Sequence, residues 1–175
     1  VGIGASGWLI GLPPPRPQLL LVGLTVGLII AGAFVPSFRA WLSEVDLRTV
    51  IAMHLTRFIG FYFLVLYARG LLPFQFAVVG GWGDIAIAAT ALAWLVLTRE
   101  PAGHRSLLRL WNLCGLIDIF FVVATAARMG LADPASMGPL RTLPLSLLPT
   151  FLVPLIIASH ILIFWRLSLA PRRKR

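Results

Sequence analysis

Five long apolar runs divide the chain, and short polar stretches separate them. The runs cover residues 18–38, 46–68, 74–98, 107–128 and 148–167. An α-helix of about 20 residues, rising 1.5 Å per residue, crosses a hydrocarbon core of roughly 30 Å. A membrane β-barrel would need alternating apolar and polar residues, which these runs lack. The pattern therefore predicts an all-α integral membrane protein, a bundle of about five transmembrane helices.

Several residues mark where the helices should begin and end. Asp46 is the expected N-cap of the second helix, and Gly70 is its expected C-terminal stop. Pro36 should end the first helix, and Pro154 should kink the fifth. Residues 129–147 are rich in Pro, Gly and Ser and are therefore expected to form a loop.

The third run is the least regular, because glycines interrupt it just before Asp84. In one interpretation the helix begins at Asp84 as N-cap, and residues 74–79 lie at the membrane interface. In the other, the helix is broken in mid-membrane between Gly80 and Gly83, as in the discontinuous helices of transporters. The sequence leaves both interpretations open.

This division predicts three parts. They are a Pro-rich N-terminal segment at residues 1–17, a five-helix transmembrane domain at 18–168 and a basic cytoplasmic tail at 169–175. In the first helix, Gly23, Gly27 and Ala31 form a ridge of small residues that another helix can approach closely. The partners we expect are membrane lipids and either further copies of the chain or a larger membrane complex.

The basic residues lie beside the apolar runs. Fifteen Lys and Arg against six Asp and Glu give a formal net charge of +9. These residues form no face with interleaved aromatic rings, which argues against nucleic acid as a partner. Most of them lie in residues 39–48, 99–109 and the C-terminal tail. Because cytoplasmic loops are rich in Lys and Arg, we expect a bacterial inner-membrane protein with its N-terminus outside and its C-terminus in the cytoplasm.

Polar side chains lie inside the apolar runs, where lipid disfavours them. Counting residues along each helix places His54 and His160 at the same depth, towards the cytoplasmic side. Arg57 and Asp118 fall near the middle of the membrane. A charge at that depth costs at least about 2.5–3.5 kcal/mol, so it must find a partner. The simplest prediction is an ion pair between Arg57 and Asp118.

Two further residues complete this buried polar site. Asn112 lies in the fourth run, on the cytoplasmic side of Asp118. Asp84 lies near the midplane if the third helix begins at Phe74, and close to the outer surface if it begins at Asp84. The chain carries no phosphate-binding motif, catalytic triad or Cys-based metal motif, so the sequence leaves open whether the protein is an enzyme.

Four functions fit this set of residues. The favoured one is b-type haem binding with a redox or electron-transfer role, with His54 and His160 as axial ligands. Arginines at the cytoplasmic ends of the helices would then meet the haem propionates; the candidates are Arg48, Arg105 and Arg109. A second function is that of an accessory or scaffold subunit, in which the polar residues only fix helix packing.

The other two functions require the carboxylates. A small proton- or cation-coupled carrier would use the two aspartates and the histidines as proton carriers. An intramembrane metalloenzyme would instead bind zinc or iron with His54 and His160 and with one or both of Asp84 and Asp118.

Overall fold

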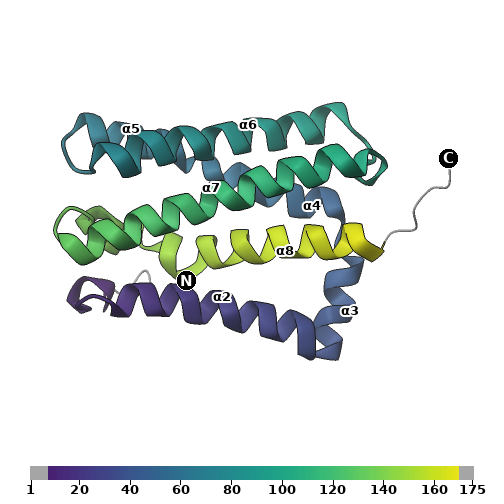
Figure 1. Cartoon of the computed structure of the whole chain (residues 1–175), viewed down its shortest axis with the longest axis horizontal. Coiled ribbons are helices and arrows are strands. Elements are labelled where there is room, and N and C mark those ends of the chain that lie inside the picture. Colours follow the sequence, from purple (N-terminus) through teal and green to yellow (C-terminus); the bar gives the residue numbers. More distant parts are fainter. Residues whose placement is uncertain (1–7, 170–175) are drawn as a thin grey trace.

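The computed structural model describes residues 8–169, and within this range the chain forms helices and turns and contains no strand. The long helices lie side by side with their axes nearly parallel, and the short helix that follows the first of them runs across this direction (Figure 1). The elements are η1 (Trp8–Gly11), α2 (Arg16–Phe34), α3 (Pro36–Glu44), α4 (Leu47–Ala52), η2 (Met53–Ile59), α5 (Gly60–Ala68), η3 (Gln75–Gly80), α6 (Gly81–Leu97), η4 (Pro101–His104), α7 (Arg105–Ala132), η5 (Gly138–Arg141), η6 (Leu148–Leu152) and α8 (Val153–Leu169).

Five helical segments in the described range are long and apolar enough to span a membrane. They are Arg16–Phe34, Leu47–Ala68, Gln75–Leu97, Pro101–Ala132 and Leu148–Leu169. These segments coincide with the five apolar runs of the sequence, so the prediction of an all-helical fold with about five such helices is confirmed. Below, they are called the first to the fifth segment.

The helix ends follow the expected capping residues. The carboxylate of Asp46 accepts a hydrogen bond from the backbone N–H of Arg48 at 3.2 Å, as an N-cap does. Gly70 has φ of +70°, the left-handed conformation in which glycine ends a helix. The first helix ends at Phe34, and α3 continues beyond it from Pro36. The fourth helix is longer than predicted and reaches Ala132, which shortens the expected loop.

The third segment is one continuous helix, so both interpretations of its glycines were wrong. It starts as a π-helix over Gln75–Gly80 and continues without a break as α6. The glycines serve close packing and do not break the helix. A Cβ atom on Gly60 of the second segment would collide with the carbonyl oxygen of Gly81. A Cβ on Gly81 would lie 3.1 Å from the carbonyl oxygen of Gly60.

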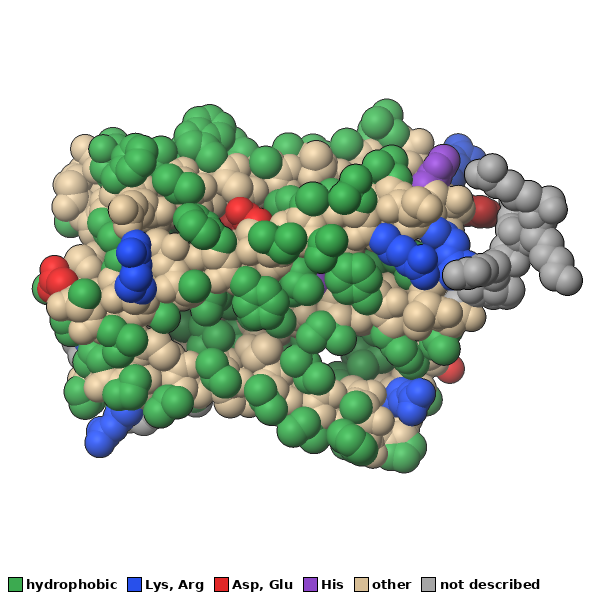
Figure 2. All heavy atoms as spheres, in the orientation of Figure 1, with side chains coloured by type: hydrophobic (Ala, Val, Ile, Leu, Met, Phe, Trp, Pro, Cys, Tyr) green, Lys and Arg blue, Asp and Glu red, His purple; other side chains and the backbone are tan. Residues whose placement is uncertain are grey.

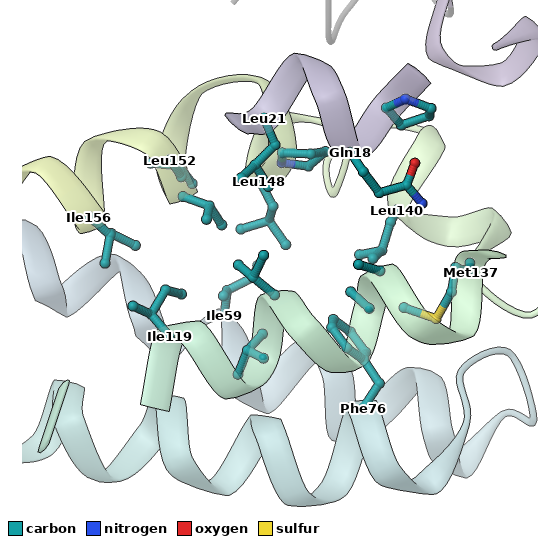
Figure 3. Close-up of a pocket in the computed structure, with 18 of the residues that line it drawn as sticks. Gln18, Leu21, Ile59, Phe76, Ile119, Met137, Leu140, Leu148, Leu152 and Ile156 are labelled. Atoms are coloured by element: carbon teal, nitrogen blue, oxygen red, sulfur yellow. The ribbon is translucent and has the colours of Figure 1, made fainter. Parts of the chain in front are cut away.

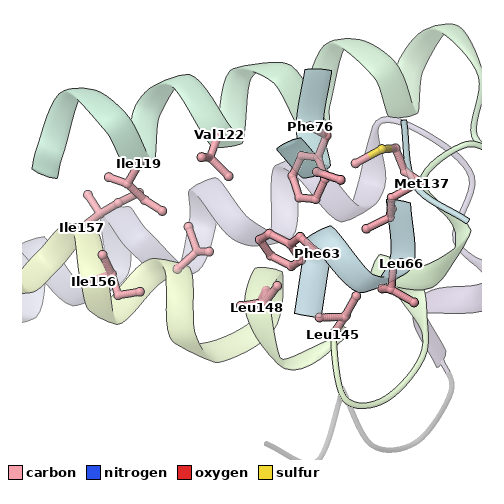
Figure 4. Packing of buried hydrophobic residues seen from close by; sticks show 13 residues of the cluster. Phe63, Leu66, Phe76, Ile119, Val122, Met137, Leu145, Leu148, Ile156 and Ile157 are labelled. Atoms are coloured by element: carbon pink, nitrogen blue, oxygen red, sulfur yellow. The ribbon is translucent and has the colours of Figure 1, made fainter. Parts of the chain in front are cut away.

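Two apolar clusters form the core, one towards each end of the segments. The first contains Phe63, Phe76, Val122 and Ile156, among others (Figure 4). The second cluster occupies the other end of the same segments, with these buried members: Leu47, Val50, Ile51, Ile87, Ala91, Trp94, Leu108, Trp111, Ile163 and Leu167.

The buried polar residues lie between these clusters along the chain. In the second segment, His54 and Arg57 separate Ile51 of the second cluster from Phe63 of the first. In the fifth segment, His160 separates Ile157 of the first cluster from the second cluster. The bundle therefore encloses a polar layer with apolar packing on either side.

Arginines at one end of the bundle bind the carbonyl groups that end the helices. Arg48 donates to the carbonyl oxygens of Leu95, at 2.6 Å, and Thr98 at the end of α6. Arg166 donates to the carbonyl of Val45 at 2.7 Å. The last carbonyls of a helix have no partner within it, so these contacts stabilise the helix ends. Figure 2 shows Lys and Arg near the ends of the molecule and mostly hydrophobic side chains between them.

The first segment is the least embedded in the bundle. Thr25 is its only buried residue, and the side chains of Leu19, Val26 and Ile30 are exposed. A Cβ on Gly23 or on Gly27 would meet no atom within 4 Å. These two glycines of the small-residue ridge therefore face no other helix of the described chain.

Candidate functional site

Arg57 lies at the centre of the polar layer and bonds to two other helices. Its Nε donates to Oδ1 of Asp84 at 2.7 Å. Its Nη1 donates to the carbonyl oxygen of Gly115 at 3.0 Å, and its Nη2 donates to Oδ2 of Asp118. The side chain of Arg57 is only 1% exposed. The structure thus brings Arg57 and Asp118 together and adds Asp84, so one guanidinium joins the second, third and fourth segments.

The local helix type aligns the polar side chains of the second segment. Residues Met53–Ile59 form a 3₁₀-helix between two α-helical pieces. Side chains three residues apart are eclipsed in a 3₁₀-helix. His54 and Arg57 therefore project from one line along the segment, and both are buried.

Glycines provide the space for the buried polar groups. A Cβ on Gly83 would overlap the carboxylate of Asp118. A Cβ on Gly115 would lie 2.6 Å from Cε1 and 3.1 Å from Nε2 of His160. Sequence reasoning assigned Gly83 no role in the site, although its position directly before Asp84 is a signal that could have suggested one.

Asn112 fixes the orientation of the His160 ring. Its Nδ2 donates to the carbonyl oxygen of His160 at 2.9 Å. Its Oδ1 is therefore free to accept from Nδ1–H of His160, at 2.8 Å. In neutral His160 the lone pair then lies on Nε2, and this atom has no hydrogen-bond partner among the described residues.

Ser159 plays the corresponding part for His54. Its hydroxyl donates to the carbonyl of Ile156 at 2.7 Å and so accepts from Nε2–H of His54 at 3.2 Å. Neutral His54 then carries its lone pair on Nδ1, which also has no hydrogen-bond partner in the described range. The two rings pack against each other with centroids 4.4 Å apart. The sequence analysis missed Ser159, although a hydroxyl next to His160 in an apolar run could have drawn attention to it.

The histidine pair does not fit a haem between its rings. With metal–nitrogen distances of about 2 Å, two axial imidazoles have ring centroids about 6 Å apart and enclose the macrocycle. The observed rings are in direct contact at 4.4 Å and are tilted by 45°. Arg48, Arg105 and Arg109, assigned above to the propionates, bind backbone carbonyls. The haem hypothesis therefore has no support in this geometry and stays a prediction.

The ligand set expected for a metalloenzyme is not assembled either. Among residues 8–169, no group of three or more His, Cys, Asp and Glu side chains could hold a metal ion. Asp84 and Asp118 are bound to Arg57, and the histidines are held by Asn112 and Ser159. The site is therefore an ion cluster beside a histidine pair.

Two cavities lie beside this polar layer. The first has a volume of about 180 Å³ and is lined by all five segments, mostly by apolar side chains, with Arg57 and Asp84 among its lining residues. Figure 3 shows Ile119, Leu148 and Leu152 pointing into it. The second, of about 390 Å³, lies between the first, second and fifth segments and α3, and Ser159 lines it. Buried polar groups therefore border a cavity on each side of the layer.

The fold and the site define an all-helical protein. It has five helices that are long and apolar enough to span a membrane, and a buried ion cluster links three of them. Residues 14–168 match the family described as Domain of unknown function (DUF8737), and the chain belongs to this family. Searches of the curated proteins and of the solved structures gave no match.

Proposed function

We propose that this protein is a multi-pass membrane protein that takes up and releases one proton at the cluster of Arg57, Asp84 and Asp118, as a small proton-coupled carrier does. Its five apolar segments suit a bacterial inner membrane. The basic loops and tail favour a cytoplasmic C-terminus and an external N-terminus.

The charge of the cluster carries this proposal. One guanidinium stands between two carboxylates, so the cluster has a net charge of −1 when both carboxylates are ionised. An uncompensated charge at this depth costs at least about 2.5–3.5 kcal/mol. A single proton on either carboxyl makes the cluster neutral, and two carboxylates that share a site favour holding such a proton.

The surroundings of the two carboxyls support exchange of that proton. Asp84 borders the first cavity, whereas the side chain of Asp118 is 20% exposed. The two carboxyls therefore border different surroundings, which is what uptake of a proton at one and its release at the other would require. The histidine pair lies next to Gly115 and leads to Ser159 in the wall of the second cavity. The histidine pair therefore adds proton-accepting groups between the ion cluster and the second cavity.

Infrared difference spectroscopy on the full chain in lipid tests this proposal. Lowering the pH should produce a carboxylic C=O band typical of a carboxyl in apolar surroundings. Asp84→Asn and Asp118→Asn should each abolish it, because Arg57 then faces a single carboxylate that stays ionised. Both variants are charge-balanced and should fold. Asp133→Asn, in the exposed turn after α7, is the matched control and should keep the band.

Two results would overturn the proposal. One is a wild-type protein that gains no such band over the whole pH range in which it remains folded. The other is a band that persists in both Asp84→Asn and Asp118→Asn, since the proton would then reside elsewhere.

A further inference from the structure

We propose that the first cavity binds a small organic cation, a substituted ammonium with an apolar body, whose charge replaces the exchangeable proton at Asp84. This inference rests on the proposed proton exchange and adds the chemical class of the ligand.

The cavity has the size and walls for such an apolar body. Its volume of about 180 Å³ is of the order of the 150 Å³ engineered cavity that binds benzene. Its lining side chains are mostly aliphatic, and Figure 3 shows Ile59, Leu152 and Ile156 around it. A single ring or a short branched chain therefore fits this space.

Asp84 supplies the attraction for a positive charge. Among the described residues that line the cavity, it is the only acidic one. Its Oδ1 accepts from Arg57, and Oδ2 accepts no hydrogen bond from the described residues. The guanidinium of Arg57 is itself bound to Asp118 and to the carbonyl of Gly115. The cluster as a whole thus keeps one negative charge that faces the cavity through Asp84.

Other groups around the cavity suit a cation as well. The rings of Phe63 and Phe76 both line it and lie 5.0 Å apart, and aromatic faces attract ammonium groups. Oε1 of Gln18, another lining residue, is buried without a hydrogen-bond partner in the described range and is a further acceptor. By contrast, Arg141 also lines the cavity and its positive charge opposes a cation there; its Nη1 donates to the carbonyl oxygen of Leu12 at 3.5 Å.

Cation and proton must compete, because the cluster has only one negative charge to neutralise. The charged and titratable groups near Asp84 are Arg57, His54, Asp118 and His160, from the second, fourth and fifth segments. Binding of one monovalent cation displaces the shared proton to water, and no bond other than the O–H bond breaks. Exchange of one cation for one proton is therefore the expected stoichiometry.

Calorimetry on the purified full chain in detergent tests this inference, with benzyltrimethylammonium chloride as the probe. In buffers of different ionisation enthalpy, we expect saturable binding of one cation with release of one proton. Neopentylbenzene has the same shape without the charge and should bind at least tenfold more weakly. Asp84→Asn should weaken cation binding at least tenfold.

A pair of variants locates the site. Leu152→Trp fills the first cavity while keeping all three residues of the ion cluster, and it should also weaken binding at least tenfold. Leu162→Trp is the matched change in the second cavity and should leave binding unchanged. The inference is overturned if the wild type shows no saturable binding, or if Leu152→Trp binds like the wild type. If the wild type shows the carboxyl infrared band but binds no cation, the proposed proton exchange is retained and only the proposed cation ligand is rejected.

Discussion

The ring of His160 occupies the space that a side chain at Gly115 would fill. A Cβ on Gly115 would lie 2.6 Å from Cε1 of His160, closer than the Cβ atom of one residue approaches the side chain of another. Asn112 holds the same histidine through its ring nitrogen and through its backbone carbonyl. The fourth segment therefore confines this ring, and the ring in turn confines His54.

Gly115→Ala should destabilise the protein by about 1–3 kcal/mol, because the His160 ring must leave its hydrogen bond to Asn112. Unfolding in mixed detergent measures the effect. Gly27→Ala is the control, since nothing lies within 4 Å of its Cβ position and alanine favours a helix. Equal stability of the Gly115→Ala variant and the wild type would contradict the packing described here.

The two carboxylates of the cluster should behave non-additively. Asp84→Asn or Asp118→Asn alone leaves Arg57 with one carboxylate, so each should cost less than about 1.5 kcal/mol. The double variant leaves a buried guanidinium without a counter-charge, and breaking such a pair costs about 3–5 kcal/mol. A double-mutant cycle of unfolding free energies should therefore show that the double variant costs more than the sum of the two single variants. Simple additivity would mean that Arg57 does not link the two carboxylates.

The hydrogen bonds assign opposite tautomers to the two histidines. When both imidazole rings are uncharged, ¹⁵N NMR of labelled histidine should show His160 protonated on Nδ1 and His54 protonated on Nε2. Asn112→Leu removes the acceptor and should abolish the Nδ1–H preference of His160 while leaving His54 unchanged. Detection of His160 with its proton on Nε2 would refute this assignment.

Reporter fusions test the proposed orientation. Alkaline phosphatase attached after Arg175 should be inactive, and a fluorescent protein at the same point should fluoresce, because the basic loops favour a cytoplasmic C-terminus. Phosphatase fused after Ala135, in the turn that follows α7, should be active. The reverse pattern would invert the orientation.

The sequence predicts the helices well because their length and apolar content do not depend on how they pack. It also predicts the equal depth of His54 and His160, whose rings touch, and of Arg57 and Asp118, which form an ion pair. Depth follows from counting residues in a helix. The rotation of each helix about its axis cannot be predicted in this way, because these segments are apolar on all sides and have little amphipathic character.

The contact of Asp84 with Arg57 illustrates what could not be predicted. It depends on the continuous third helix and on close packing of Gly60 against Gly81. Glycines in an apolar run are compatible with a break, a turn or a close contact, and only the neighbouring helix decides among them. The role of Ser159 beside His54 likewise depends on the rotation of the fifth segment.

The central position of Arg57 also has a consequence for synthesis of the chain. Its partners Asp84 and Asp118 follow it by 27 and 61 residues. At about 5–20 residues per second, a ribosome completes the helix of Asp118 seconds after that of Arg57. Until the later helices are made, the second helix therefore carries a positive charge that lacks both of the carboxylate partners it has in the folded chain.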